Sequence, residues 1–309
     1  MAAEEVPRLR PLSRTDVLDE LFALYRRGFK TFAGIAAVVN VPLAILSLAF
    51  VPFMSTIPQL SAAGRDPTPQ FWAALGTAAV AFLIFMPVAV VGSILEEAAT
   101  CYATSAYYLG EKLTVREAYR LALAHFWPLL RLSLLLGLLL VGVPLLGFLP
   151  VIFPPLLCLS LPLAALFICY LGVRWSVAIP GMVLEQGRSA VGALQRSWLL
   201  TTDAWWRTFS TLLILWFLVG ILQSIATGLV SALTAGAQFA SATAQTTPPL
   251  WVPILNSLLS SLIGILFGPL IWIGVTLIYY DRRIRVEAYD LAIMARELGR
   301  RPEAEPPPL

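Results

Sequence analysis

The sequence has 309 residues, of which 59% are hydrophobic and 13% are charged, and its net charge is +3. A soluble domain is about half apolar and about one quarter charged, so this composition excludes an ordinary soluble globular protein and predicts an integral membrane protein. The three cysteines and the single histidine show neither metal-ligand nor disulfide-framework spacing. We therefore expect no metal site, no cofactor and no disulfide framework.

Six apolar runs are long enough to cross a bilayer, which takes about 20 helical residues. Backbone groups inside lipid must be hydrogen-bonded within the protein, so runs of this kind form helices. The sequence therefore predicts an all-α, polytopic membrane protein with six transmembrane helices. The predicted spans are residues 31–53, 71–95, 129–149, 156–175, 208–233 and 250–280.

The polar segments between and beyond these spans predict cytoplasmic amphipathic helices at 17–27, 115–123, 190–200 and 284–298. Their apolar side chains recur at three- and four-residue spacing, and Thr114 followed by Glu117 reads as a capping box. We divide the chain into four parts on this basis. They are a cytoplasmic N-terminal segment (1–30), a six-helix transmembrane domain (31–280), a cytoplasmic amphipathic helix (281–299) and a disordered tail (300–309).

The positions of the basic residues predict the orientation in the membrane. Of the 21 Lys and Arg residues, only Arg65 lies in a loop that follows an odd-numbered span. Short cytoplasmic loops carry an excess of Lys and Arg, so both termini are expected in the cytoplasm and the protein in the inner (plasma) membrane.

Three units of the chain share one plan, in which an amphipathic helix leads through an aromatic or basic junction into a helical hairpin. The junctions lie at residues 29–30, 126–127 and 205–207. This pattern favours an internal repeat. The alternative is that any helix leaving the bilayer acquires such residues, because Trp, Tyr and Arg suit the headgroup zone.

Residues 183–201 read Val-Leu-Glu-Gln-Gly-Arg-Ser-Ala-Val-Gly-Ala-Leu-Gln-Arg-Ser-Trp-Leu-Leu-Thr, and weaker motifs occur at 108–118 and 279–287. These stretches resemble the membrane-domain family of glycerophosphoryl diester phosphodiesterases and its stand-alone bacterial relatives. The resemblance implies a membrane domain whose catalytic partner is a separate soluble barrel with paired histidines and acidic metal ligands. This chain has one histidine, so we do not expect it to carry that enzymatic activity.

The polar residues in or beside the spans are candidates for a site. Ionisable groups near a membrane are costly unless they are paired or hydrated, so those near the cytoplasmic ends either form a vestibule or lipid-phosphate site or are ordinary boundary charges. Arg174 could pair with Glu96 or Glu97. The cytoplasmic-side candidates are Glu96, Glu97, Arg131, Arg174, Glu185, Arg196 and Arg207. The midspan candidates are Asn40, Gln223 and Asn256, which could bind a substrate or join helices.

The leading functional hypothesis is a non-enzymatic scaffold or lipid-associated assembly factor of the bacterial cell envelope, because no catalytic constellation is visible. The alternative is a transporter or lipid-handling permease, and the third hypothesis is a membrane-embedded enzyme acting on lipid headgroups. Membrane lipids are the expected partners, together with another membrane protein or a second copy of the chain. Nucleic-acid binding is not expected, because membrane topology accounts for the arginines.

Overall fold

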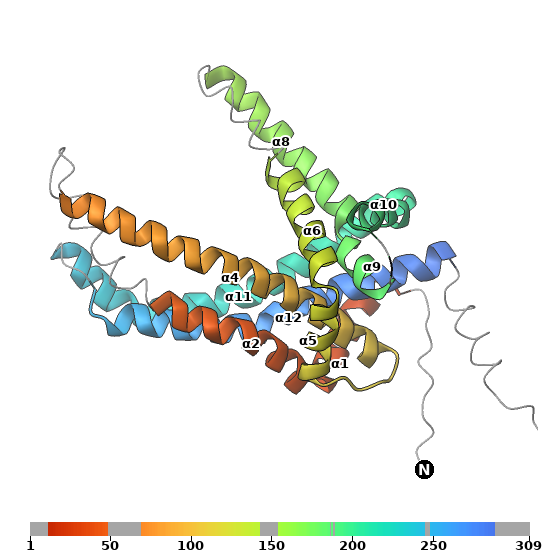
Figure 1. The fold of residues 1–309 in the computed structure, drawn as a ribbon, viewed down its shortest axis with the longest axis horizontal. Helices are drawn as coiled ribbons and strands as arrows, with labels where there is room; N and C mark the ends of the chain where they lie inside the picture. The colour runs from red at the N-terminus through yellow and green to blue at the C-terminus, as the bar shows by residue number, and fades with distance from the viewer. Residues whose placement is uncertain are drawn as a thin grey trace, which may run out of the picture.

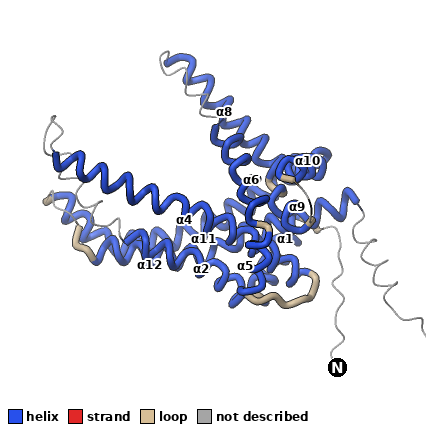
Figure 2. Tube along the Cα trace, viewed as in Figure 1, coloured by secondary structure: helices blue, strands red, loops and turns tan. Residues whose placement is uncertain are grey.

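A computed structural model describes residues 12–48, 69–142, 154–185, 187, 189–244 and 248–287. Throughout these ranges the ordered elements are helices, joined by turns and short loops (Figures 1 and 2). The candidate spans form two arms that diverge from a common end (Figure 1). The all-α class predicted from the sequence is confirmed.

The longer arm, which we call the bundle arm, contains four long apolar helices. These helices are α2 (Phe29–Leu48), α4 (Pro69–Tyr108), α11 (Trp205–Thr243) and α12 (Trp251–Glu287). The second arm, the hairpin arm, leans away from it (Figure 1) and consists of α6 (Phe126–Gly137), the π-helical turn η1 (Leu138–Gly142) and α8 (Pro154–Trp175).

Short helices gather where the two arms meet, and we call this group the collar. It consists of α1 (Arg14–Arg27), α5 (Val115–Ala124), α9 (Ala178–Leu184) and α10 (Ala190–Thr201), with the 3-10 turn η3 (Thr202–Ala204) after α10. The predicted capping box begins α5, since the Glu117 N–H donates to Thr114 Oγ1 at 3.3 Å and the Thr114 N–H donates to the Glu117 carboxylate at 2.9 Å. The order of short helix, junction and two long helices occurs three times, and the internal repeat stays a prediction.

Five of the described helices are long and apolar enough to cross a membrane. The pair α5 and α6, bent by 74° at His125, would supply a sixth span. The 40 residues of α4 extend about 60 Å at 1.5 Å per residue, twice the hydrocarbon thickness of about 30 Å. The long helices therefore continue beyond the predicted spans into the collar or past the opposite end.

Three segments differ from the sequence-based expectation. Residues 178–184, between the fourth predicted span and the next predicted amphipathic helix, form the short helix α9, in which Pro180 falls in the first turn and its missing N–H costs nothing. The fifth span was predicted to end at residue 233, whereas α11 is helical to Thr243. The helix expected to begin anew at residue 281 continues α12 without a break as far as Glu287, and an ion pair between Asp281 and Arg285 supports this turn. Residues 288–309 and Arg65 lie outside the described part of the chain.

The core lies at the common end of the arms. Leu21 and Leu24 of α1 are fully buried there, as is Tyr279 of α12. The Tyr25 hydroxyl donates to the carbonyl of Leu266 at 2.6 Å, which fixes α1 to α12. The amphipathic stripe of α1 is thus buried against the long helices and does not face the lipid.

Helix α12 packs tightly against the Leu215 side chain of α11 at Gly274, where a Cβ would lie 2.5 Å from Leu215 Cδ2. Leu215 is fully buried and has little room to move. We expect Gly274→Ala to lower the free energy of unfolding by about 1–3 kcal/mol through overpacking, measured by thermal unfolding in detergent. Gly220→Ala is the control, because a Cβ there meets no atom within 4 Å. Equal stability of the two variants would contradict this packing.

Candidate functional site

An ion-pair network joins α9, α10 and α12 in the collar. Arg196 donates from Nε to Glu185 Oε1 at 3.0 Å, and its Nη2 also pairs with Glu287. Glu185 Oε1 accepts a hydrogen bond from the Tyr279 hydroxyl at 2.7 Å, and Arg283 pairs with Glu287 at 3.1 Å. The charges of two carboxylates and two guanidinium groups cancel in this network. It therefore holds the helices together and leaves no net charge for a ligand.

A second network surrounds Asp281, whose side chain is 7% exposed. Its carboxylate accepts from Arg282 at 2.9 Å, from Arg285 at 2.8 Å and from the Leu12 N–H at 3.0 Å. Arg207 Nε lies 3.6 Å from the same carboxylate, and its Nη2 donates to the Leu12 carbonyl. The network therefore fixes the segment before α1 to α11 and α12.

Arg174 is held by aromatic side chains at the end of α8. Its guanidinium carbon lies 4.7 Å from the ring centroid of Trp198 and 5.3 Å from that of Tyr170. Its Nε and Nη2 donate to the Tyr170 hydroxyl at 3.2 Å, and its carbonyl accepts from Ser197 at 2.7 Å. These contacts join α8 to α10, and no pairing of Arg174 with Glu96 or Glu97 is present among the described contacts. Arg131 is exposed on α6.

Glu96 points from α4 toward α2 and α12. Its Oε2 accepts from Asn40 Nδ2 at 3.4 Å, and Gly268 of α12 lies close to its Oε1. Asn40 also lines an open groove of about 450 Å³ between α2 and α12, which we call the serine groove. The polar lining of this groove is Asn40, Ser47, Asn256, Ser257, Ser260 and Ser261.

The structure brings two of the three midspan candidates together. Asn40 and Asn256 both line the serine groove, and the Ser261 hydroxyl donates to the Asn40 carbonyl at 3.0 Å. Ser47 and Ser257 share a hydrogen bond of 2.6 Å across the two helices. Gln223 lies on α11 and does not line the groove.

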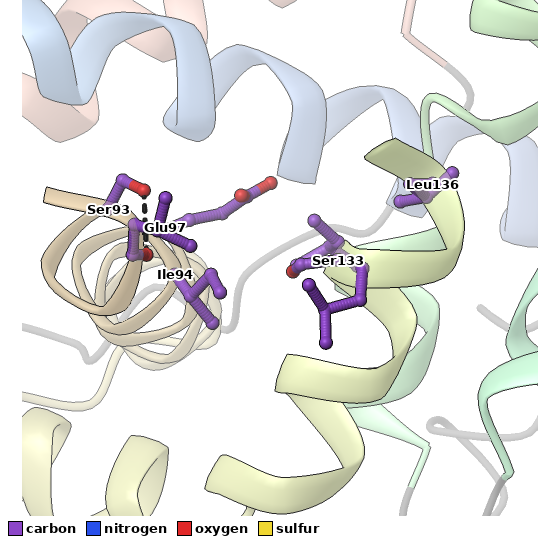
Figure 3. A pocket seen from close by; sticks show the side chains of 8 residues that line it. Ser93, Ile94, Glu97, Ser133 and Leu136 are labelled. Carbon is purple, nitrogen blue, oxygen red and sulfur yellow. Dashed lines mark hydrogen bonds between the residues drawn. The ribbon is translucent and has the colours of Figure 1, made fainter. Parts of the chain in front are cut away.

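Glu97 points from α4 into a second open cavity, which lies between α4, α6 and α9 (Figure 3). This cavity, which we call the root cavity, has a volume of about 240 Å³ and lies where the two arms meet. Glu97 is 8% exposed, and within the described part of the chain its carboxylate has no hydrogen-bond or ion-pair partner. The other polar residues are Ser93 and Ser133, and the apolar lining is Val90, Ile94, Leu134, Leu136 and Ile179.

The sequence missed Ser93, Ser133 and Asp281 as members of these sites. One signal was present for the root cavity: Val90, Ser93, Ile94 and Glu97 fall at positions i, i+3, i+4 and i+7, so they share one face of α4. No pattern marked Ser133 on α6 as the residue opposite, because helix pairing is set by tertiary packing.

The fold defines a multi-pass, all-α integral membrane protein with polar sites at the junction of its arms. Residues 152–292 match the family model described as the membrane domain of glycerophosphoryl diester phosphodiesterase. The resemblance seen in the sequence is therefore confirmed over this part of the chain, which includes α8 to α12. No curated protein and no solved structure matches the chain.

Proposed function

We propose that this membrane protein handles lipids, taking a lipid from the bilayer sideways between its two arms and placing the headgroup in the root cavity. One observation carries the proposal. An open cavity at the junction of the two diverging arms has apolar walls and a buried carboxylate, Glu97, for which the described residues supply no partner.

The surfaces of the two arms suit the acyl chains of such a lipid. Large apolar side chains are exposed along both arms, including Leu83 of α4 at 69% and Leu166 of α8 at 68%. Exposed apolar surface of this extent marks contact with a membrane or a partner. The cavity itself is below the usual ligand-site range of about 300–1,000 Å³, so it suits part of a headgroup better than a whole lipid.

The orientation that accompanies this proposal places the collar in the cytoplasm and the protein in the inner membrane. The basic residues support it, because the described Lys and Arg residues lie on the collar helices, in the loop before α5, on α6, or near the collar ends of α2, α8, α11 and α12. The root cavity then lies near the cytoplasmic leaflet, and both chain termini are cytoplasmic.

The serine groove favours the transport alternative as a second candidate. Its hydroxyl and amide groups run along α2 and α12 and end at Glu96. Hydroxyls and carbonyls in a span can coordinate a cation. These groups are already bonded to one another across α2 and α12, however, which supports a role in joining helices. The scaffold or assembly-factor hypothesis is retained as the alternative in which the exposed arms meet another membrane protein or a second copy.

Native mass spectrometry of the full-length protein released in mild detergent tests the proposal. We expect one or a few lipid molecules to remain bound after dilution with detergent has removed the surrounding bilayer lipid. If every protein molecule lost all of its lipid on dilution, the proposal that the protein handles lipids would be overturned. Co-elution of a second protein in fixed stoichiometry, with no retained lipid, would favour the scaffold instead.

A further inference from the structure

We infer that the root cavity binds a primary ammonium group, with Glu97 as its counter-ion and with Ser93 and Ser133 as two further hydrogen-bond acceptors (Figure 3). The proposed function determines only which molecule carries the ammonium group, and under that proposal it is the headgroup of an amino lipid. The residues themselves would bind the same group on a soluble amine.

The Glu97 carboxylate is the group in the cavity that a cation would stabilise. Its side chain enters the cavity from α4 and is 8% exposed, and no described residue forms a hydrogen bond or an ion pair with its carboxylate. Glu96 precedes it in the chain and faces Asn40 of α2. A buried carboxylate without a hydrogen-bond or ion-pair partner is costly, and a bound cation would relieve this cost.

The number of acceptors matches the number of donors on a primary ammonium group, which has three N–H bonds. The Ser93 hydroxyl donates to the Val90 carbonyl at 2.9 Å, so its oxygen is left to accept. The Ser133 hydroxyl has no partner in the described part of the chain and lies on the opposite wall, on α6. With the Glu97 carboxylate, the cavity presents one charged and two neutral acceptors.

The rest of the lining argues against other cations. Quaternary ammonium groups are bound by aromatic side chains, and the described lining of the root cavity contains no aromatic residue. Ca²⁺ takes six to eight oxygen ligands and Mg²⁺ keeps an octahedral shell, whereas one carboxylate and two hydroxyls among aliphatic walls supply far fewer. The cavity should therefore distinguish ethanolamine-type headgroups from choline-type headgroups.

The test titrates the full-length protein in detergent with phosphatidylethanolamine, with phosphatidylcholine of the same chains, and with free ethanolamine, and counts bound molecules by native mass spectrometry. We expect phosphatidylethanolamine to bind at least about tenfold more tightly than phosphatidylcholine. Glu97→Gln keeps the shape of the side chain but removes the charge, and it should abolish this preference, so that the two phospholipids bind with affinities that differ by less than about threefold. Ser133→Ala should reduce it less.

Glu96→Gln is the matched control, because it removes the neighbouring charge on the same helix but faces Asn40 outside the cavity. It should retain the preference. Binding of free ethanolamine that Glu97→Gln abolishes would support the ammonium site with a soluble source, even if no lipid were retained and lipid handling failed. Equal binding of the two phospholipids to the unaltered protein would overturn the inference while leaving lipid handling intact. An equal loss of preference in Glu96→Gln and Glu97→Gln would also overturn it.

Discussion

Replacing Asp281 with alanine is expected to cause the largest loss of stability among single substitutions in the collar, about 3 kcal/mol. Asp281 is the only described acidic group that accepts from Arg282, whose side chain is 4% exposed. It also balances Arg285 and Arg207. Removing one partner of a buried ion pair costs about 3–5 kcal/mol, because the remaining charge is left buried and uncompensated. The partial exposure of Arg207 and Arg285 keeps the expected value at the lower end of that range.

The same substitution should loosen the start of the described chain. The Leu12 N–H donates to Asp281, and its carbonyl accepts from Arg207 and from Arg285. The measurement is the thermal unfolding midpoint in detergent together with hydrogen exchange along α1. Asp203→Asn removes an acidic group from an exposed position in η3 and should change neither. If Asp281→Ala matched this control, the network would contribute little to the fold.

The sequence predicted those parts of the fold that depend on residues close together in the chain. Runs of apolar residues identified the spans, and Thr114 with Glu117 identified the start of α5. Glu96 and Glu97 were read as the end of the second span, and the helix was expected to continue past them to Tyr108, where α4 ends. A helix that leaves the lipid can continue when its next face is buried in protein, as α4 does through residues 98–101, which are fully buried.

The sites followed less well, because they depend on which helices meet. Glu185 and Arg196 were both singled out, and the turn between α9 and α10 brings them together. Glu96 and Glu97 were read as one cluster, yet adjacent residues on a helix point about 100° apart, and these two face different spaces. The contact between Leu12 and Asp281 joins residues 269 positions apart, and no local pattern predicts such a pairing.

Two adjacent carboxylates of α4, Glu96 and Glu97, belong to different parts of the protein. Glu96 is engaged by Asn40 within the bundle arm, whereas Glu97 is the group left for a ligand at the junction with the hairpin arm. A change that affects only the root cavity should therefore leave the packing of the bundle arm intact. This separation should allow the proposed lipid site to be blocked without unfolding the protein.

Ser133→Trp is expected to abolish retention of the lipid by filling the root cavity from the α6 wall. The indole would occupy space in an open cavity of about 240 Å³ that is otherwise available to a headgroup. It would also remove one hydroxyl acceptor. Fully burying an aromatic side chain against aliphatic walls is favourable, so we expect the variant to fold and its unfolding midpoint to stay close to that of the unaltered protein. Lipid retention, measured by native mass spectrometry, should fall at least about tenfold, since a headgroup excluded from the cavity loses its charged hydrogen bond to Glu97.

Leu138→Trp provides the matched control, because Leu138 lies on the same arm, is 67% exposed and does not line the cavity. It adds an aromatic residue to the lipid-facing surface without narrowing the root cavity, so lipid retention should be unchanged. Retention of the same lipid by Ser133→Trp and Leu138→Trp would place the bound lipid elsewhere on the arms. Loss of lipid from both would mean that the outer surface of the hairpin arm holds it, since only that surface is altered in the control. Loss from Ser133→Trp alone is the result that a headgroup site between α4 and α6 requires.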